Sequence, residues 1–214
     1  MAKKTILMVE GKDDVHVVMH ICGARELGEI SQIKEHGGKD KLLESIGIRV
    51  KESELDSLGI LLDADTDLAA RWDAVTHRLA DAGYLNLPVI PDQEGTVILP
   101  PEGTLLPRVG VWLMPNNLIE GILEDFLCFL VPEGDRLFEH VERSIDSIPN
   151  GCKNFEALAE PKAKIHTWLA WQNEPGKPLG QAISSKYLDA KLPTADKFAA
   201  WLTRTFFMEN MGAG

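Results

Sequence analysis

The chain has 214 residues, of which 44% are apolar and 26% charged, and its 33 acidic and 22 basic side chains give a net charge of −11. These values are those of an ordinary folded protein and exclude wholesale disorder. The excess of acidic residues argues against a protein that coats nucleic acid through charge alone, but it leaves room for an enzyme whose metal ion supplies positive charge.

Short apolar runs alternate with amphipathic segments through the first half of the chain. Apolar, β-prone runs predict strands at residues 6–9, 30–33, 58–62, 97–99 and 111–114. Apolar residues spaced three and four apart predict helices at residues 13–22, 39–46 and 68–82. The first of these helices is expected to present an apolar face made of Val15, Val18, Met19 and Cys22.

The second half of the chain has helical patterning instead. The pattern predicts helices at residues 119–130, 134–147, 162–172 and 196–208, with proline and glycine between them. Together the two halves predict an α/β fold with a mainly parallel sheet flanked by helices. We expect this α/β core to span residues 1–117 and a helical C-terminal region, packed on the core, to span residues 118–214.

The cysteine content and the hydropathy pattern indicate the cellular setting. The three cysteines, Cys22, Cys128 and Cys152, cannot form a disulfide framework and include no CxxC pair, which predicts a reducing cytoplasm. No apolar stretch approaches the length of a membrane span. The apolar run that follows the basic N-terminus is too short for the core of a signal peptide.

Acidic residues follow two of the strongest predicted strands. Glu10 ends the first, and Asp63, Asp65 and Asp67 follow the strand at 58–62. Because the carboxyl ends of parallel strands meet at one edge of a sheet, these side chains are expected to lie close together. Alternation along an extended segment would point the three aspartates the same way. Carboxylates crowded in this manner need a counter-charge, and Mg²⁺ (or Mn²⁺) is suited to that role.

Each of these acidic residues also has a purely structural interpretation. Asp and Glu are common in turns and before helices, so Glu10, Asp63 and Asp65 could serve as caps and turn residues. Asp67 is as well placed to be the N-cap of the following helix as to be a metal ligand. Asp13 and Asp14 are expected to be first-turn acids that favour the helix dipole.

Two segments together resemble the TOPRIM domain found in topoisomerases, primases, recombination nucleases and overcoming-lysogenization-defect nucleases. They are Ile-Leu-Met-Val-Glu-Gly-Lys-Asp-Asp at residues 6–14 and Leu-Leu-Asp-Ala-Asp at residues 61–65. The TOPRIM family has a Glu after its first strand and an Asp-x-Asp after its third, and the resemblance covers residues 5–115. The remainder resembles a bacterial subgroup of stand-alone TOPRIM-like proteins of unassigned function, notably in Leu-Glu-Asp-Phe-Leu at 123–127 and His-Thr-Trp-Leu-Ala-Trp-Gln at 166–172.

This resemblance implies roles for three residues. Glu10 would act as a general acid/base or as a metal ligand, and Asp63 and Asp65 would hold Mg²⁺. The chain departs from two branches of the family. It has only Tyr84 and Tyr187, with no room for the tyrosine-nucleophile domain of topoisomerases, and its cysteines offer no zinc module of the primase kind.

Further candidates lie outside this motif. Glu124 follows the strand at 111–114 and could complete a second metal position, although a polar helix face is the favoured interpretation. Gly37-Gly38-Lys39 could form an amide nest for a phosphate before a helix, although a plain turn is favoured, and the segment is not a Walker A loop. Lys12 could contact a phosphate or remain a solvated surface lysine.

Three functions are compatible with these residues. The first is an Mg²⁺-dependent, nuclease-like phosphodiesterase that acts on nucleic acid. The second is a non-enzymatic regulatory or defence-associated effector that works through a partner such as an ATPase, as the charge of −11 suggests. The third, a receiver-like phosphoryl acceptor, is ranked last because an Asp-x-Asp-x-Asp run stands where a receiver has a lone Asp.

Overall fold

A five-stranded sheet forms the centre of the computed structural model, which describes residues 4–149 and 151–208. Its strands are β1 (Lys4–Val9), β2 (Gln32–Glu35), β3 (Leu55–Asp63), β4 (Thr96–Ile98) and β5 (Arg108–Met114). Their order is β2-β1-β3-β5-β4, and all neighbours are parallel except β4 and β5, which are antiparallel. The predicted mainly parallel α/β sheet is confirmed.

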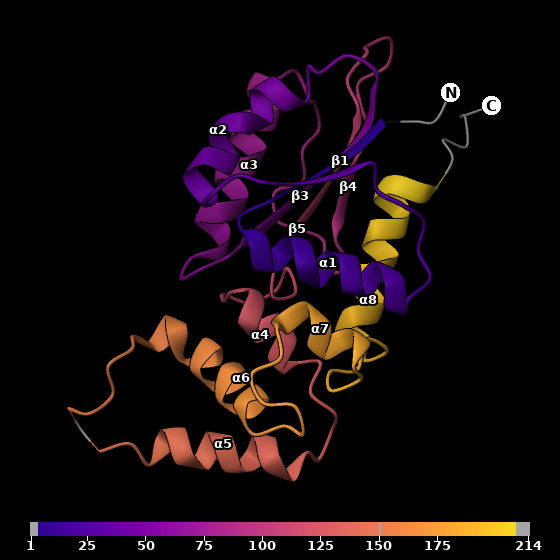
Figure 1. Cartoon of the computed structure of the whole chain (residues 1–214). Coiled ribbons are helices and arrows are strands. Elements are labelled where there is room, and N and C mark those ends of the chain that lie inside the picture. The colour runs from indigo at the N-terminus through magenta and orange to yellow at the C-terminus, as the bar shows by residue number, and fades with distance from the viewer. Residues whose placement is uncertain (1–3, 150, 209–214) are drawn as a thin grey trace.

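Helices cover both faces of the sheet, so its central strands are buried on both sides (Figure 1). Successive residues of a strand point to opposite faces and therefore enter different cores. In β1, Leu7 and Val9 belong to one buried cluster, whereas Ile6 and Met8 belong to the other. This double burial explains why the strands are continuous apolar runs in the sequence rather than alternating ones.

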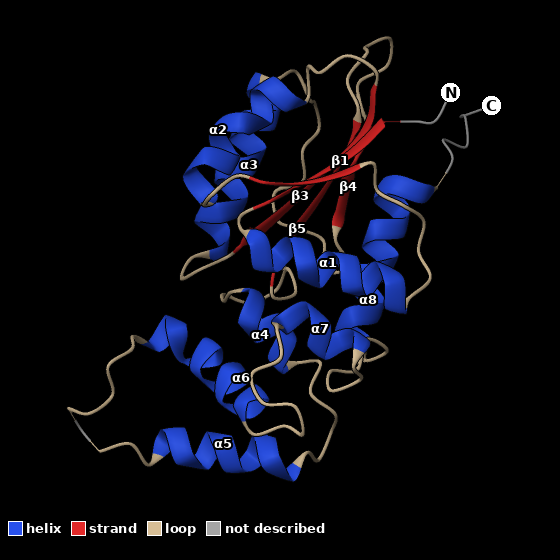
Figure 2. Cartoon of the chain, viewed as in Figure 1, coloured by secondary structure: helices blue, strands red, loops and turns tan. Residues whose placement is uncertain are grey.

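Three helices belong to the α/β core (Figure 2): α1 (Lys12–Ala24), α2 (Lys39–Arg49) and α3 (Leu68–Asp81). The predicted apolar face of α1 was wrong at Met19, which is 56% exposed. The buried residues of α1 are Asp14, Val17, Val18 and Ile21. The helix is apolar around most of its circumference, so the pattern alone did not distinguish the stripe that meets the sheet.

The C-terminal region is helical, as predicted, but its elements are shorter and more numerous than expected. They are α4 (Leu123–Cys128), α5 (Arg136–Asp146), η1 (Ala157–Ala159), α6 (Glu160–Ala170), α7 (Leu179–Ser184), α8 (Pro193–Leu202) and the π-helical turn η2 (Thr203–Phe207). The helix expected from residue 119 begins only at Leu123, because Asn117 and Gly121 have positive φ angles of 62° and 143°. The six-residue α7 was not predicted.

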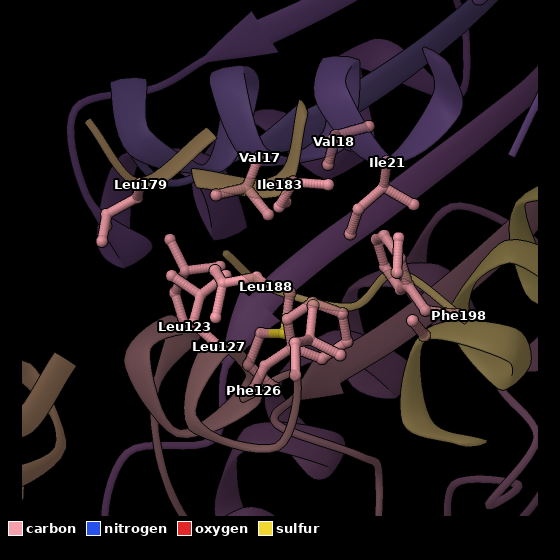
Figure 3. Close-up of a cluster of buried hydrophobic side chains, with 14 of the residues drawn as sticks. Val17, Val18, Ile21, Leu123, Phe126, Leu127, Leu179, Ile183, Leu188 and Phe198 are labelled. Carbon is pink, nitrogen blue, oxygen red and sulfur yellow. The ribbon is translucent and has the colours of Figure 1, made fainter. Parts of the chain in front are cut away.

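Helices α1, α4, α7 and α8 share one buried core with the sheet (Figure 3). Val17 and Ile21 of α1 approach Ile183 of α7, and Phe126 of α4 packs against Phe198 of α8 with ring centroids 5.3 Å apart. This buried cluster joins residues from both 1–117 and 118–214. The division of the chain at residue 117 stays a prediction.

Two glycines on neighbouring strands allow η2 to lie directly on the sheet. Gly59 of β3 and Gly110 of β5 are paired in register. A Cβ atom at Gly59 would lie 2.5 Å from Phe206, and one at Gly110 would lie 2.1 Å from Thr205 Oγ1. The absence of side chains at these two positions therefore determines how closely the C-terminal segment packs.

Gly110→Ala is expected to lower the free energy of unfolding by about 1–3 kcal/mol, since the added methyl group overfills a closed contact. Gly47→Ala is the matched control, because Gly47 lies within the last turn of α2 and a Cβ atom there meets nothing within 4 Å. The control should raise stability by about 0.5–1 kcal/mol through its effect on helix propensity. Urea unfolding of both variants measures the difference, and an equally stable Gly110→Ala protein would contradict the packing described.

Among the described residues, none of the helices combines the length and the apolar character that crossing a membrane requires.

Candidate functional site

The carboxyl ends of β1 and β3 bring Glu10 and Asp63 into contact. The two strands are parallel neighbours in the sheet, with Met8 opposite Ile60; Glu10 directly follows β1, and Asp63 is the last residue of β3. Glu10 Oε1 accepts a hydrogen bond of 2.8 Å from the backbone N–H of Asp63. The predicted approach of these two segments, which lie far apart in the sequence, is confirmed.

The Asp63 side chain lies in an unusually unfavourable place for a negative charge. Burial, which has the largest effect, and the negative charges of Glu10, Asp14, Glu124 and Asp65 together raise the pKa of Asp63 to about 9. Its Oδ1 is buried and accepts no hydrogen bond from the described part of the chain. A carboxyl in this position must either hold a proton or meet a cation, because an unpaired buried charge is costly.

Glu10 shares part of this environment. Burial raises the pKa of Glu10 above its usual value, and the nearby charge of Asp65 adds to the effect. The hydrogen bond from Asp63 N–H and the positive charges of Arg71 and Lys39 act in the opposite direction. Glu10 therefore binds a proton more tightly than an exposed glutamate does.

Asp14 is a member of the site that the sequence analysis assigned only to the first turn of a helix. Its Oδ2 accepts a 2.9 Å hydrogen bond from Gly11 N–H, so it does cap α1. The side chain is nevertheless buried, and burial together with the charges of Glu10 and Glu124 raises the pKa of Asp14 to about 7. Its spacing from Val17, Val18 and Ile21 was the available signal that it faces inward.

Glu124 is brought to the same edge of the sheet by α4. It is 5% exposed, and its charge raises the pKa of both Asp63 and Asp14. Lys162 of α6 places its Nζ 3.1 Å from Glu124 Oε1. The favoured interpretation of Glu124, a polar helix face, is wrong, because its side chain is buried beside Asp63 and Asp14.

Asp65 departs from the extended geometry expected of the Asp-x-Asp-x-Asp run. Its φ of 54° lies in the left-handed region, which Asp tolerates better than most residues. Its backbone exchanges hydrogen bonds of 2.9 and 2.8 Å with Gly121. The carboxylate receives Lys39 Nζ at 2.7 Å and an Arg71 guanidinium nitrogen at 2.5 Å. The three aspartates therefore do not point the same way, and Asp65 is already paired with two cations.

Asp67 has the capping role that the sequence left open. Its Oδ1 accepts a 2.8 Å hydrogen bond from Ala70 N–H at the start of α3, and the residue is exposed. It is not among the groups that raise the pKa of Asp63. Asp67 therefore acts as a helix cap and not as a member of the acidic group around Asp63.

The Gly37-Gly38 segment does not present free amides to a phosphate. Both N–H groups donate to the backbone carbonyl of Glu10, each at 3.0 Å. The weaker alternative, an amide nest, is therefore not formed by Gly37 and Gly38, since these donors position Glu10 instead. Lys39, the first residue of α2, reaches the site through its side chain, whereas Lys12, at the start of α1, is exposed.

We call Glu10, Asp14, Asp63, Asp65 and Glu124 the carboxylate cluster. As they are arranged, no three His, Cys, Asp or Glu side chains in the described ranges form a finished metal site. The donor set nevertheless fits a hard divalent ion in its chemistry, because it consists of carboxylate oxygens, one of which is buried without a partner. Mg²⁺ binding would therefore require side chains of the cluster to reorient.

Comparisons with known proteins give a family but no activity. The sequence matches the family described as "Protein of unknown function (DUF3226)" over residues 4–207. No curated protein and no solved structure matches the chain. Since the match covers nearly the whole chain, this protein belongs to the DUF3226 family.

Proposed function

We propose that the protein is an Mg²⁺- or Mn²⁺-dependent, TOPRIM-like enzyme that hydrolyses phosphodiester bonds in nucleic acid. The observation that carries this proposal is the buried, unpartnered Asp63 Oδ1 among neighbouring carboxylates at the ends of two parallel strands. Such a site is destabilised unless protons or cations enter it. Glu10, Asp63 and Asp65 would hold the ion, and Glu124 with Asp14 would serve a second position.

The order of the acidic residues along the fold supports the TOPRIM likeness. Glu10 directly follows β1, and Asp63 and Asp65 stand at the end of the third strand in the chain. This is the arrangement that the resemblance implies. Tyr84 is buried, with its hydroxyl donating to the Pro107 carbonyl at 2.7 Å, and is therefore unsuited to be a nucleophile. A hydrolytic reaction, in which water attacks the phosphorus, is favoured over strand passage.

In this proposal the residues of the chain place the reacting groups and move one proton. Hydrolysis joins a water oxygen to phosphorus, while the bond to the leaving sugar oxygen breaks and that oxygen takes up a proton. Glu10 is placed to accept the water proton, since Asp63 N–H fixes its Oε1 and burial raises its pKa above that of an exposed glutamate. A bound divalent ion would supply positive charge against the phosphate oxygens.

A second candidate function is that of a partner-dependent regulatory or defence effector, with an ATPase as one possible partner. The charge of −11 and the pairing of Asp65 with two cations favour it, because an isolated chain then has little free positive charge with which to bind nucleic acid. A partner that co-purifies with the chain and confers activity on it would support this alternative.

The proposal predicts metal-dependent cleavage that depends on Glu10. Wild-type protein and Glu10→Gln are compared on single-stranded DNA, duplex DNA and RNA with Mg²⁺ or Mn²⁺. Glu10→Gln keeps an acceptor for Asp63 N–H but cannot take a proton, so cleavage should fall by at least about 100-fold. Asp40→Asn, in the first turn of α2, is the control and should leave cleavage unchanged. A wild-type protein inert on all three substrates, although it binds the ion, would contradict the enzymatic proposal.

A further inference from the structure

Three basic side chains from three different helices neutralise part of the charge of the carboxylate cluster. Lys39 at the start of α2 and Arg71 in α3 both pair with Asp65 Oδ2, at 2.7 and 2.5 Å. Lys162 in α6 pairs with Glu124 Oε1 at 3.1 Å. These cations occupy carboxylate oxygens that a metal ion would also use. A divalent ion at Asp65 or Glu124 must therefore compete with them.

The three cations differ in how firmly they are held. Arg71 is the anchored one, because its side chain is 11% exposed and its Nε also donates to the Asp63 carbonyl at 2.9 Å. The side chains of Lys39 and Lys162 are 44% and 55% exposed. A lysine ammonium on a flexible, solvated stem can turn to a new partner without disturbing the fold.

The balance of charge changes sign as divalent ions enter. The cluster has five carboxylates and three paired cations, so one divalent ion makes the fully ionised site neutral and a second makes it positive. Cations that have lost part of their carboxylate partners are then available to an anion. The phosphates of a nucleic-acid strand have the matching charge, and both lysine and arginine bind phosphate oxygens.

We propose that Lys39 and Lys162 are exchangeable counter-ions, which pair with Asp65 and Glu124 in the metal-free protein and turn to substrate phosphates once divalent ions bind, while Arg71 stays paired with Asp65. This inference rests on the proposed function, because it requires divalent ions in the carboxylate cluster. It assigns the two lysines a second role in binding phosphates of the strand, and it explains how a strongly acidic chain holds a polyanion.

The test separates binding of the ion from binding of the strand. Lys39→Ala and Lys162→Ala are compared with wild type by calorimetry with Mg²⁺ alone, and by fluorescence anisotropy with a labelled single-stranded DNA in Ca²⁺. Lys51→Ala is the matched control, because Lys51 is exposed beyond the opposite end of α2. We expect Mg²⁺ affinity to stay equal or rise, since a competing cation is gone, while DNA affinity falls about 10-fold for each variant.

The salt dependence of DNA affinity distinguishes a phosphate contact from a purely structural role of the lysines, because a structural role would not change it. Losing one phosphate contact should reduce the slope of log affinity against log salt by about 0.7 for a single strand. Two results would contradict the proposed exchange of lysine partners without contradicting the metal site. One is weaker Mg²⁺ binding in Lys39→Ala, and the other is DNA affinities and salt slopes equal to those of Lys51→Ala. A wild-type protein that binds no divalent ion would defeat the proposed function as well.

Discussion

Asp63→Asn is expected to stabilise the metal-free protein at pH 7 and to abolish its binding of Mg²⁺. Folding forces the Asp63 carboxyl to hold a proton that the unfolded chain has already lost, since its pKa rises to about 9. Asparagine has nearly the same shape, avoids that cost, and can donate to the neighbouring carboxylates. The free energy of unfolding should rise by about 1–3 kcal/mol, whereas the ligand charge needed for the ion is removed.

Asp67→Asn is the matched control for this substitution. Asp67 caps α3 and is exposed, and asparagine caps helices about as well as aspartate. Neither stability nor Mg²⁺ affinity should change by more than a few tenths of a kcal/mol in this variant. Urea unfolding in the presence of a chelator measures the first quantity, and calorimetry measures the second. Unchanged Mg²⁺ affinity in Asp63→Asn would remove Asp63 from the ligand set.

The metal-free protein is expected to lose stability as the pH rises. The pKa of Asp14 is raised to about 7 and that of Asp63 to about 9, from an ordinary value of 3.8, so the folded state binds more protons than the unfolded state. Their contribution is complete below about pH 4 and is lost as pH rises through the folded values, by up to about 1.4 kcal/mol per pH unit for each carboxyl. The negative charges of Glu10, Glu124 and Asp65 face these carboxyls. The positive charges of Lys39 and Arg71 act in the opposite direction on the neighbouring Glu10, where they lower the pKa.

Mg²⁺ should reverse this trend. The ion binds ionised carboxylates, so its stabilising effect is expected to grow with pH where the metal-free protein weakens. Thermal unfolding followed from about pH 5 to pH 9, with a chelator and with millimolar Mg²⁺, should give curves that diverge as pH rises. Salt bridges lower the pKa values of Glu52 and Glu160. These two groups therefore change the pH dependence of stability only below about pH 4.5, outside the measured range. Parallel curves would contradict a metal site in the carboxylate cluster.

The approach of Glu10 to Asp63 could be predicted from the sequence because it depends on backbone topology alone. Buried parallel strands are continuous apolar runs, and the residues at their carboxyl ends must share one edge. The same local patterns indicated the strands correctly to within a few residues. The helix expected from residue 119 failed because positive φ angles at Asn117 and Gly121 delay its start, and Gly121 exchanges backbone hydrogen bonds with the distant Asp65.

The burial and the pairing of each carboxylate could not be predicted from these local patterns. Asp14 looked like a first-turn acid, because its burial depends on Glu124 and the sheet enclosing it from other parts of the chain. Gly37 and Gly38 looked able to bind a phosphate, but their N–H groups donate to Glu10. Asp65 looked like a free ligand, but its partners come from α2 and α3.

The sequence by itself determined that this chain is an α/β protein with acidic residues gathered at one edge of a parallel sheet. Hydrophobic periodicity, which acts over short stretches of chain, is sufficient for the fold class, and the carboxyl ends of parallel strands share one edge of the sheet. Only the tertiary structure decided which of those acids are buried, which cap a helix and which are paired with a cation. Burial and charge pairing depend on side chains brought together from distant segments, and their strength changes steeply with distance and exposure.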